Sequence, residues 1–164
     1  MSDIMLIGLG HNGATALIET ADYELIEPHK WRLSGKGYAI THKRNGTPHS
    51  TLMHRVILAA PPGTFVDHIN RNRLDNRRSN LRLATLRQNA ANRKPLSASG
   101  LKGVVYNRGH RRWQAYIKPG GGQQQHLGYY ATPIEAAHAY NAAARDAFGD
   151  FANTNDDTPP SRDW

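Results

Sequence analysis

The feature that most constrains the fold is a polar loop, residues 70–80, that separates two short apolar segments. The segments beside it, 64–68 and 81–85, each have the length of a short strand. Thr85 and Gln88 have the spacing of a capping box, which predicts a helix from residue 85 to about residue 93. Strand, loop, strand and helix within about 30 residues predict a ββα unit.

Positive charge is concentrated in the same region. The formal net charge is +8, and residues 67–94 hold eight Lys or Arg against two acids. Seven of the eight are arginines: Arg71, Arg73, Arg77, Arg78, Arg82, Arg87 and Arg93. Because the planar guanidinium pairs well with phosphate, this cluster favours nucleic acid as the partner. A solvated charged surface is the alternative.

The composition also excludes several classes of protein. The chain has no cysteine, which excludes disulfides, thiolate catalysis and zinc sites with cysteine ligands. No apolar run reaches the roughly 18 residues that a membrane-spanning helix needs, and the N-terminus lacks the features of a secretory signal. We therefore expect a cytoplasmic protein with no membrane partner.

Residues 1–62 are predicted to form a β-rich region. Apolar runs at 4–9 and 14–18 flank an Asn-Gly pair, a strong hairpin signal. A second hairpin is predicted around residues 31–40, followed by a helix at 51–59 that ends before two prolines. The region therefore supplies hairpins next to the ββα unit of residues 63–94.

Three glycines in the first hairpin, Gly8, Gly10 and Gly13, have the spacing of the dinucleotide-binding fingerprint. That motif requires a helix directly after it and a βαβ unit around it. A short strand is predicted there instead, so we interpret the glycines as turn residues.

The last third of the chain, residues 100–155, is predicted to be a separate domain. Three antiparallel strands fit residues 101–107, 111–118 and 123–130. A capping box of Thr132 and Glu135, with Pro133 at the first helical position, begins a helix that is predicted to end at Gly149 in the left-handed conformation. Residues 95–99 form a predicted linker and residues 156–164 a flexible tail. The fold class is therefore α+β.

Alternation along the middle strand of this domain predicts its two faces. Trp113, Ala115 and Ile117 are predicted to face the helix, and Arg112, Gln114, Tyr116 and Lys118 to face away from it. A stripe of alanines, at 136, 139, 143 and 147, is predicted to let the helix approach the sheet closely.

The ββα unit carries residue types that suit phosphodiester hydrolysis. Asp67 and Asn89 offer hard oxygen ligands for Mg²⁺, and His68 is a base that is neutral near pH 7. Asn80 is predicted either to hold the loop through backbone hydrogen bonds or to orient the His68 ring. The spacing alone leaves open whether these residues form a nuclease site or an ordinary polar surface.

A resemblance to a known family favours the nuclease site over the polar surface. The signature consists of Val66-Asp67-His68-Ile69-Asn70, Leu74-Asp75-Asn76-Arg77-Arg78-Ser79-Asn80-Leu81-Arg82, Thr85 and Gln88-Asn89. It resembles the HNH homing endonucleases of phages and bacteria, in the form where Asn replaces the final His. The segment Met53-His54-Arg55 also resembles this family, more loosely, and His54 is interpreted as a packing residue.

The HNH resemblance implies a ββα-metal nuclease core and roles for its residues. It implies that Asp67 and Asn89 bind the divalent metal, Mg²⁺ or another such as Mn²⁺. His68 would be the general base, and Asn80 would hold the loop of the motif. The substrate would be double-stranded DNA, in a bacterial or phage-infected cytoplasm.

The C-terminal domain is similar to the Apetala/ethylene-response-factor (ERF) DNA-binding domain. The resemblance is carried by Gly100-Leu-Lys-Gly103-Val104, Trp113-Gln-Ala-Tyr-Ile117, Leu127-Gly128-Tyr129-Tyr130, Glu135-Ala136-Ala137 and Ala139-Tyr140-Asn141. It implies that the exposed sheet face lies in the DNA major groove. Val105, Asn107 and His126 replace base-reading residues of that family, so its target sequence does not carry over.

The sequence therefore predicts a metal-dependent HNH endonuclease that nicks or cleaves DNA, with a C-terminal domain that aids site binding. Predicted DNA contacts in that domain are Arg111, Arg112, Gln114, Tyr116, Lys118 and His126. The alternatives are an inactive DNA-binding or regulatory protein and, less favoured, an RNA-binding protein. No protein partner is predicted, and monomer or dimer stays open.

Overall fold

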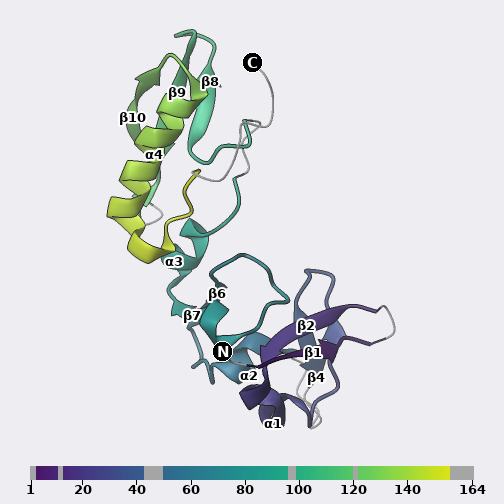
Figure 1. Ribbon diagram of the computed structural model, residues 1–164. Coiled ribbons are helices and arrows are strands. Elements are labelled where there is room, and N and C mark those ends of the chain that lie inside the picture. The colour runs from purple at the N-terminus through teal and green to yellow at the C-terminus, as the bar shows by residue number, and fades with distance from the viewer. Residues whose placement is uncertain (1–2, 11–12, 43–49, 96–98, 120–121, 156–164) are drawn as a thin grey trace. The chain divides into compact units, whose positions relative to one another are not determined.

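The computed structural model describes residues 3–10, 13–42, 50–95, 99–119 and 122–155. It shows a mixed α/β protein with small sheets, divided into two compact units, Met1–Leu86 and Arg87–Trp164 (Figure 1). The boundary between the units falls within a short helix, upstream of the linker predicted at 95–99. The functional domain limits stay a prediction.

The first unit begins with a hairpin of β1 (Ile4–Gly8) and β2 (Thr15–Glu19), as the sequence predicts. Ala16 and Ile18 of β2 are fully buried. A 3₁₀ turn, η1 (Thr20–Asp22), leads into α1 (Tyr23–Ile26). Asn12 of the predicted turn lies outside the described residues.

A second antiparallel sheet follows in the first unit. Its strands are β3 (Arg32–Leu33), β4 (Ala39–His42) and β5 (Ser50–Leu52), in that order, and α2 (Met53–Ile57) comes next. The prediction of a helix over 51–59 is wrong at its start. Thr51 and Leu52 pair with β4 instead, and the chain can turn into a helix only after this pairing ends.

The central hairpin of the first unit consists of β6 (Phe65–His68) and β7 (Leu81–Ala84), joined by the polar loop that ends in η2 (Arg78–Asn80). The loop is bonded to the first hairpin. Leu17 donates to the carbonyl of Leu74 at 2.8 Å and accepts from the Asn76 N–H at 2.8 Å. Next comes α3 (Leu86–Ala91), directly after Thr85; its packing on the hairpin stays a prediction.

One apolar core joins these elements of the first unit. It contains Leu9, Ala16, Ile18, Ile26, Trp31, Ala39, Met53, Ile57, Val66 and Leu81. Since β6 and β7 contribute Val66 and Leu81, the central hairpin is anchored to the rest of the unit by buried apolar surface. The residues carried by this hairpin therefore stand on a rigid support.

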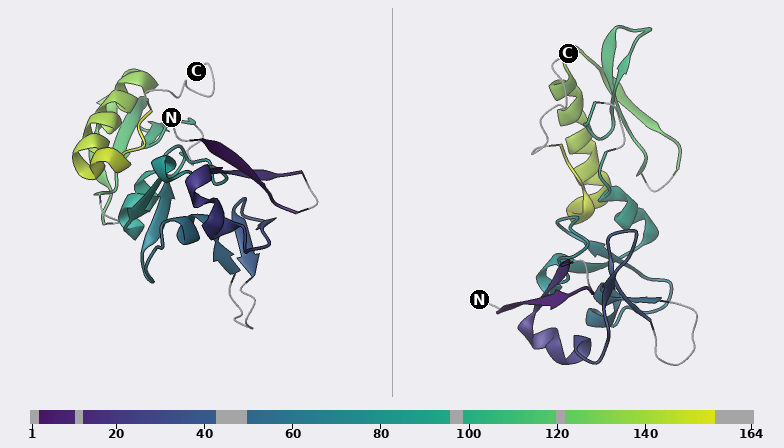
Figure 2. Two further views of the ribbon diagram at one scale, coloured as in Figure 1. Left: turned by 60° about the horizontal axis from the view of Figure 1, so that its bottom comes forward. Right: turned by 90° about the vertical axis from the view of Figure 1, so that its right-hand side faces the viewer.

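The second unit is a three-stranded antiparallel sheet with α4 (Pro133–Phe148) packed against it, and Figure 2 shows the helix lying along the sheet. The strands are β8 (Val104–Asn107), β9 (Arg112–Ile117) and β10 (Gln125–Tyr130). All three lie within the predicted ranges. Trp113, Ala115 and Ile117 are buried, as the alternation along β9 predicts.

The face of α4 that meets the sheet differs from the prediction. Ala136, Ala137, Tyr140 and Ala144 are buried, whereas Ala147 is exposed. Ala139 and Ala143 of the predicted stripe also pack against the core. The prediction is wrong only at Ala147 and in omitting Tyr140, whose ring packs where Gly103 leaves room. A Cβ added at Gly103 would lie 2.1 Å from the Tyr140 ring.

The two ends of α4 confirm one expectation and correct another. Thr132 and Glu135 form the predicted capping box. Gly149 has φ 53° and ψ −130°, so its φ is positive but its backbone is not left-handed helical. Its N–H nevertheless bonds the Arg145 carbonyl and ends the helix.

Candidate functional site

Asp67 and His68 lie at the end of β6, and both are buried, each with 5% of its surface exposed. Neighbouring residues of a strand point to opposite faces. Asp67 lies opposite Arg82 of β7, and His68 opposite Leu81. The two functional groups therefore have different surroundings.

The Asp67 carboxylate pairs with Arg82 across the hairpin. The Arg82 guanidinium contacts Oδ2 of Asp67 through Nε at 2.9 Å and Nη2 at 2.8 Å. A half-buried arginine that offsets a buried carboxylate stabilises its charge. Arg82, predicted as a DNA contact, thus has a role inside the site.

The His68 ring is held by an amide that the sequence did not single out. Its Nε2 lies 3.4 Å from Oδ1 of Asn76, whose own Nδ2 donates to the Leu74 carbonyl at 3.2 Å. Since the Asn76 oxygen faces His68, Nε2 carries the hydrogen and Nδ1 keeps the lone pair. Burial lowers the pKa of His68, although Asn76 and Asp67 partly oppose this shift. The imidazole is therefore neutral, as a base requires.

Two further rings surround His68. The His54 ring meets it edge-on, with centroids 4.9 Å apart, and Tyr38 lies 6.1 Å from it. Burial first, and then the nearby His68 and Arg55, together lower the pKa of His54 from 6.5 to about 3. His54 is thus a neutral packing residue, as the sequence analysis interprets it, but it packs against the candidate base. Tyr38 gave no signal in the sequence beyond its place in a hairpin.

The polar loop is organised around the buried Asp75. Arg77 binds its carboxylate at 2.7 and 2.6 Å, and Asn70 donates to it at 2.7 Å. These bonds, that of Arg77 first, lower the pKa of Asp75 against the opposing effect of burial. Asp75 is therefore an ionised anchor for the loop.

Asn80 holds the same loop, which is the first of the two roles left open for it. Its Oδ1 accepts from the Asn70 N–H at 2.9 Å, and its Nδ2 donates to the Asp75 carbonyl at 2.8 Å. Both of its amide groups bind backbone, and the side chain that contacts the His68 ring is Asn76. Asn80 is thus a positioning residue.

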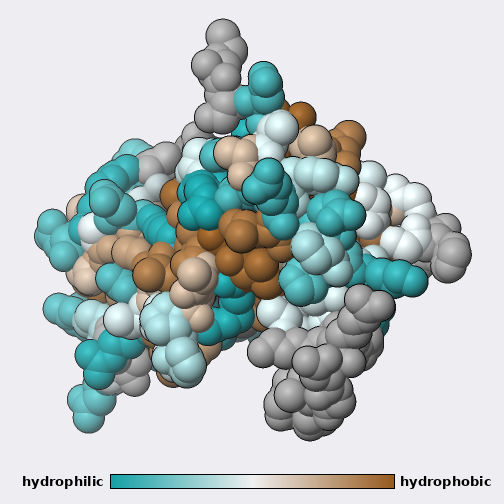
Figure 3. All heavy atoms as spheres, turned by 90° about the horizontal axis from the view of Figure 1, so that it is seen from below, coloured by the Kyte–Doolittle hydropathy of each residue, from teal (hydrophilic) through white to brown (hydrophobic). Residues whose placement is uncertain are grey.

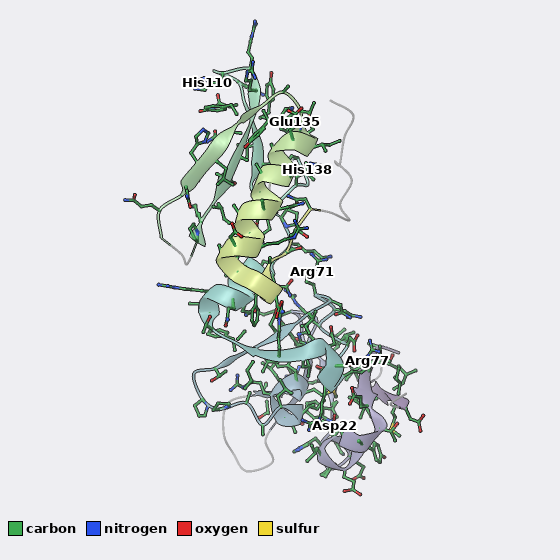
Figure 4. All side chains as sticks on the ribbon, turned by 60° about the vertical axis from the view of Figure 1, so that its left-hand side comes forward. Asp22, Arg71, Arg77, His110, Glu135 and His138 are labelled. Carbon is green, nitrogen blue, oxygen red and sulfur yellow. The ribbon has the colours of Figure 1, made fainter. Side chains whose placement is uncertain are left out.

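Several predicted DNA contacts bind the protein itself. Arg77 pairs with Asp75, Arg78 pairs with Asp22 at 2.7 Å, and Arg73 donates to the Lys36 carbonyl at 2.6 Å. Figure 4 labels Asp22, Arg71 and Arg77 in this unit. Arg71 is exposed in the loop. The arginine cluster is therefore largely a framework for the site.

Asn89, the second predicted metal ligand, is half-buried on α3 and belongs to the second unit. Arg87 and Arg93 are exposed in the same segment. Within the described ranges, no three His, Asp or Glu side chains gather as a metal-binding group. The Asp67 carboxylate and the Asn89 amide each offer oxygen, the donor type that hard divalent cations prefer.

A hollow in the first unit is a separate feature. It lies beside β1 and α1, and its lining includes Ile7, Tyr23, Ile26 and Trp31 but neither Asp67 nor His68. Figure 3 shows apolar side chains gathered among hydrophilic ones on one face of the molecule. Asp67 and His68 therefore lie outside this hollow.

In the second unit, the predicted DNA contacts share the sheet face opposite α4, here called the open face. The strand register places on it Val105, Asn107, Arg112, Gln114, Tyr116, His126 and Tyr129. Arg111 and Lys118 are exposed at the two ends of β9. The face is thus polar and aromatic, with cations at its margins.

Charge in the second unit is divided between the two layers. The acids of residues 99–155 are Glu135, Asp146 and Asp150, and all lie on α4 or on η4 (Gly149–Phe151). Figure 4 shows Glu135 and His138 on the helix and His110 at the end of the sheet. The strands and turns from 100 to 131 carry lysines and arginines and no acid. The open face therefore suits a polyanion.

Comparison with known proteins agrees with this geometry. Residues 52–91 match the HNH endonuclease family, a range that includes α2, β6, the polar loop, β7 and α3. A protein of Acanthamoeba polyphaga mimivirus, named as an uncharacterized HNH endonuclease, is 30% identical over 152 residues. The match covers 92% of this chain and 79% of the viral protein.

The chain belongs to the HNH endonuclease family. An alignment over 92% of the chain extends well into the second unit, so the similarity to the viral HNH protein is not confined to the motif. HNH nucleases act on DNA and generally use a divalent metal. Among the helices described, none combines the length and the apolar character needed to cross a bilayer.

Proposed function

We propose that this HNH protein is a homing-type, metal-dependent endonuclease that hydrolyses phosphodiester bonds in double-stranded DNA. The observation that carries the proposal is the state of His68. The ring is buried beside Asp67, kept neutral, and held by Asn76 so that Nδ1 is the proton acceptor.

Asp67 and Asn89 are the residues proposed to hold the divalent metal. The Asp67 carboxylate is a hard oxygen ligand, and the Asn89 amide oxygen is another, which fits Mg²⁺ and also Mn²⁺. When bound, such a metal polarises the scissile phosphate and stabilises the leaving oxygen. Arg82 pairs with the Asp67 carboxylate and orients it.

His68 is proposed to take a proton from the attacking water at Nδ1. The Asn76 oxygen then stabilises the imidazolium through the Nε2–H, and nearby Asp67 adds its charge. Asn80 and Asp75 hold the loop that carries Asn76. Asn80 and Asp75 are thus proposed to act by positioning His68, and not by contacting the phosphate.

The second unit is proposed to bind the DNA site through the open face, as its resemblance to the ERF domain implies. Proposed base or phosphate contacts are Arg111, Arg112, Gln114, Tyr116, Lys118 and His126, with Arg71, Arg87 and Arg93 as further phosphate contacts. The division of charge between α4 and the strands supports this orientation.

A plasmid-nicking assay tests the proposal. We expect nicking or cleavage with Mg²⁺ or Mn²⁺, and no activity in excess chelator. The Arg82 pair on Asp67 favours a second candidate, a DNA-binding protein without nuclease activity, because it occupies a carboxylate oxygen. DNA binding with no nicking under any divalent metal would establish that candidate and overturn the nuclease.

A further inference from the structure

A directional chain of hydrogen bonds crosses the open face of the second unit. The His110 backbone N–H donates to Oδ1 of Asn107 at 3.0 Å. Nδ2 of Asn107 then donates to Oε1 of Gln114 at 3.2 Å, and Nε2 of Gln114 lies 3.2 Å from Nδ1 of His126. The chain links the turn after β8 to all three strands.

The backbone end of this chain determines the direction of every later bond. A backbone N–H is always a donor, so the Asn107 oxygen must face it and the Asn107 nitrogen must face Gln114. The Gln114 oxygen accepts, which leaves its nitrogen to donate to His126. Nδ1 of His126 is therefore an acceptor, and in the neutral ring the hydrogen is on Nε2.

The ring that carries this hydrogen is exposed and supported. His126 is solvent-exposed, and its centroid lies 4.6 Å from Tyr129, which also contacts His110 at 4.3 Å. In the described part of the chain, no hydrogen bond forms at Nε2 of His126. The face thus presents one N–H donor whose orientation is set in advance.

We propose that the chain through Asn107 and Gln114 makes His126 a fixed hydrogen-bond donor that reads an acceptor on a base edge of double-stranded DNA. The inference rests on the proposed DNA-binding role of the open face. In the major groove, guanine offers two adjacent acceptors, N7 and O6, adenine and thymine offer one each beside a donor or a methyl group, and cytosine offers only a donor. His126 therefore favours guanine and rejects cytosine at the base it meets, and Asn107 and Gln114 are its positioning residues.

The first test measures the tautomer in the full chain without DNA. Long-range ¹H–¹⁵N correlation at about pH 8.5, where imidazoles are largely neutral, shows which ring nitrogen carries the hydrogen. We expect Nε2–H for His126, and a mixture in the Asn107→Ala variant. Gln125→Ala, which removes an amide next to His126, is the matched control and leaves the tautomer unchanged. A hydrogen on Nδ1 in the wild type overturns the inference.

The second test measures base preference by selecting sites from randomised DNA. We expect His126→Phe to lose a guanine preference at one position, and 7-deazaguanine there to weaken wild-type binding about threefold to tenfold, the effect of one hydrogen bond. Asn107→Ala is expected to weaken the base preference at the same position, and Gln125→Ala is expected to leave the preference unchanged at every position.

The outcomes separate this inference from the proposed function. If Lys118→Ala and Arg112→Ala weaken binding but His126→Phe leaves every position unchanged, the open face binds DNA and the inference alone fails. If none of these variants alters DNA binding, the open face is not the reader and both fail. Preference restricted to RNA would likewise overturn both.

Discussion

The two units use their polar residues in opposite ways. In the first, buried acids bind arginines: Asp22 pairs with Arg78, Asp67 with Arg82, and Asp75 with Arg77. In the described part of the second, the acids lie on the helix layer, and the strands carry cations and amides. The arginines therefore pair with buried acids in one unit, whereas the cations lie on an exposed surface in the other. The sequence shows the same excess of arginine over acids in both units. Variants that separate these uses test the comparison.

The largest effect is expected from His68→Ala. Loss of the base is expected to lower the rate of DNA cleavage by about 10²- to 10⁴-fold, measured by plasmid nicking. DNA affinity, measured by gel shift, is expected to stay within a few-fold, because binding depends on other residues. His29→Ala, at an exposed histidine of the same unit, is the control. Collapse of binding in His68→Ala would show that the residue is structural.

Gly103→Ala is expected to damage the second unit selectively. The added Cβ would lie 2.1 Å from the Tyr140 ring and 2.5 Å from the Tyr116 carbonyl, at φ +70°. We expect a loss of about 3 kcal/mol or more from overpacking and strain, seen as an early transition in thermal unfolding. Nicking is expected to persist but with less site preference.

Gly122→Ala is the matched control for that variant, since its Cβ would meet nothing closer than 3.6 Å. It is expected to unfold like the wild type. Equal site selectivity in Gly103→Ala and Gly122→Ala would contradict the division of labour between the units.

The stability of the first unit is expected to fall with acid. The folded-state pKa of His54 is about 3, against 6.5 as its ordinary value, so the unfolded chain binds more protons between these values. Stability therefore increases with pH in this window, by up to about 1.4 kcal/mol per pH unit. Between pH 6.5 and 5, His54 is expected to account for a loss of about 2 kcal/mol, measured by urea unfolding.

His54→Phe is expected to flatten this pH dependence, whereas His29→Phe is expected to leave it unchanged. The part that remains in His54→Phe is expected to come from His68, whose pKa is also lowered by burial. An unchanged slope in His54→Phe would mean that His54 is not buried as a neutral ring.

The smallest effect concerns the salt dependence of DNA binding. If about six cations contact phosphate, the slope of log K against log salt is near −5. Lys118→Ala is expected to reduce this slope by about one without loss of stability. Arg77→Ala is expected to lower stability and to leave the slope unchanged, because Arg77 binds Asp75 within the protein. Equal reductions of the slope would show that Arg77 also contacts phosphate.

Local patterns predicted the hairpins and strands well, because turn residues and alternation act over a few positions. The strands 4–8, 65–68 and 112–117 all lie within predicted segments. The capping box at Thr132 was likewise predictable from a short pattern. Asn80 as the holder of the loop was one of two roles that its position allowed.

Features that depend on distant contacts could not be predicted. Asn76 contacts His68 only because the polar loop is bonded to Leu17, far away in the sequence. The buried face of α4 depends on the room that Gly103 leaves for Tyr140. The arginines gave a signal of charge but none of their partners, since Asp22 and Arg78 are 56 positions apart.

The end of α3 has a consequence for engineering the protein. The Ala91 and Arg93 carbonyls accept hydrogen bonds from the Lys102 ammonium, and Asn153 donates to the Asn92 and Arg93 carbonyls. A chimera joined near residue 96, within the linker predicted from the sequence, would separate these carbonyls from Lys102 and Asn153. The carbonyls would then lose their hydrogen-bond donors. Such a fusion should transfer the three-stranded sheet together with residues 87–95, so that the end of α3 keeps the residues that bond to it.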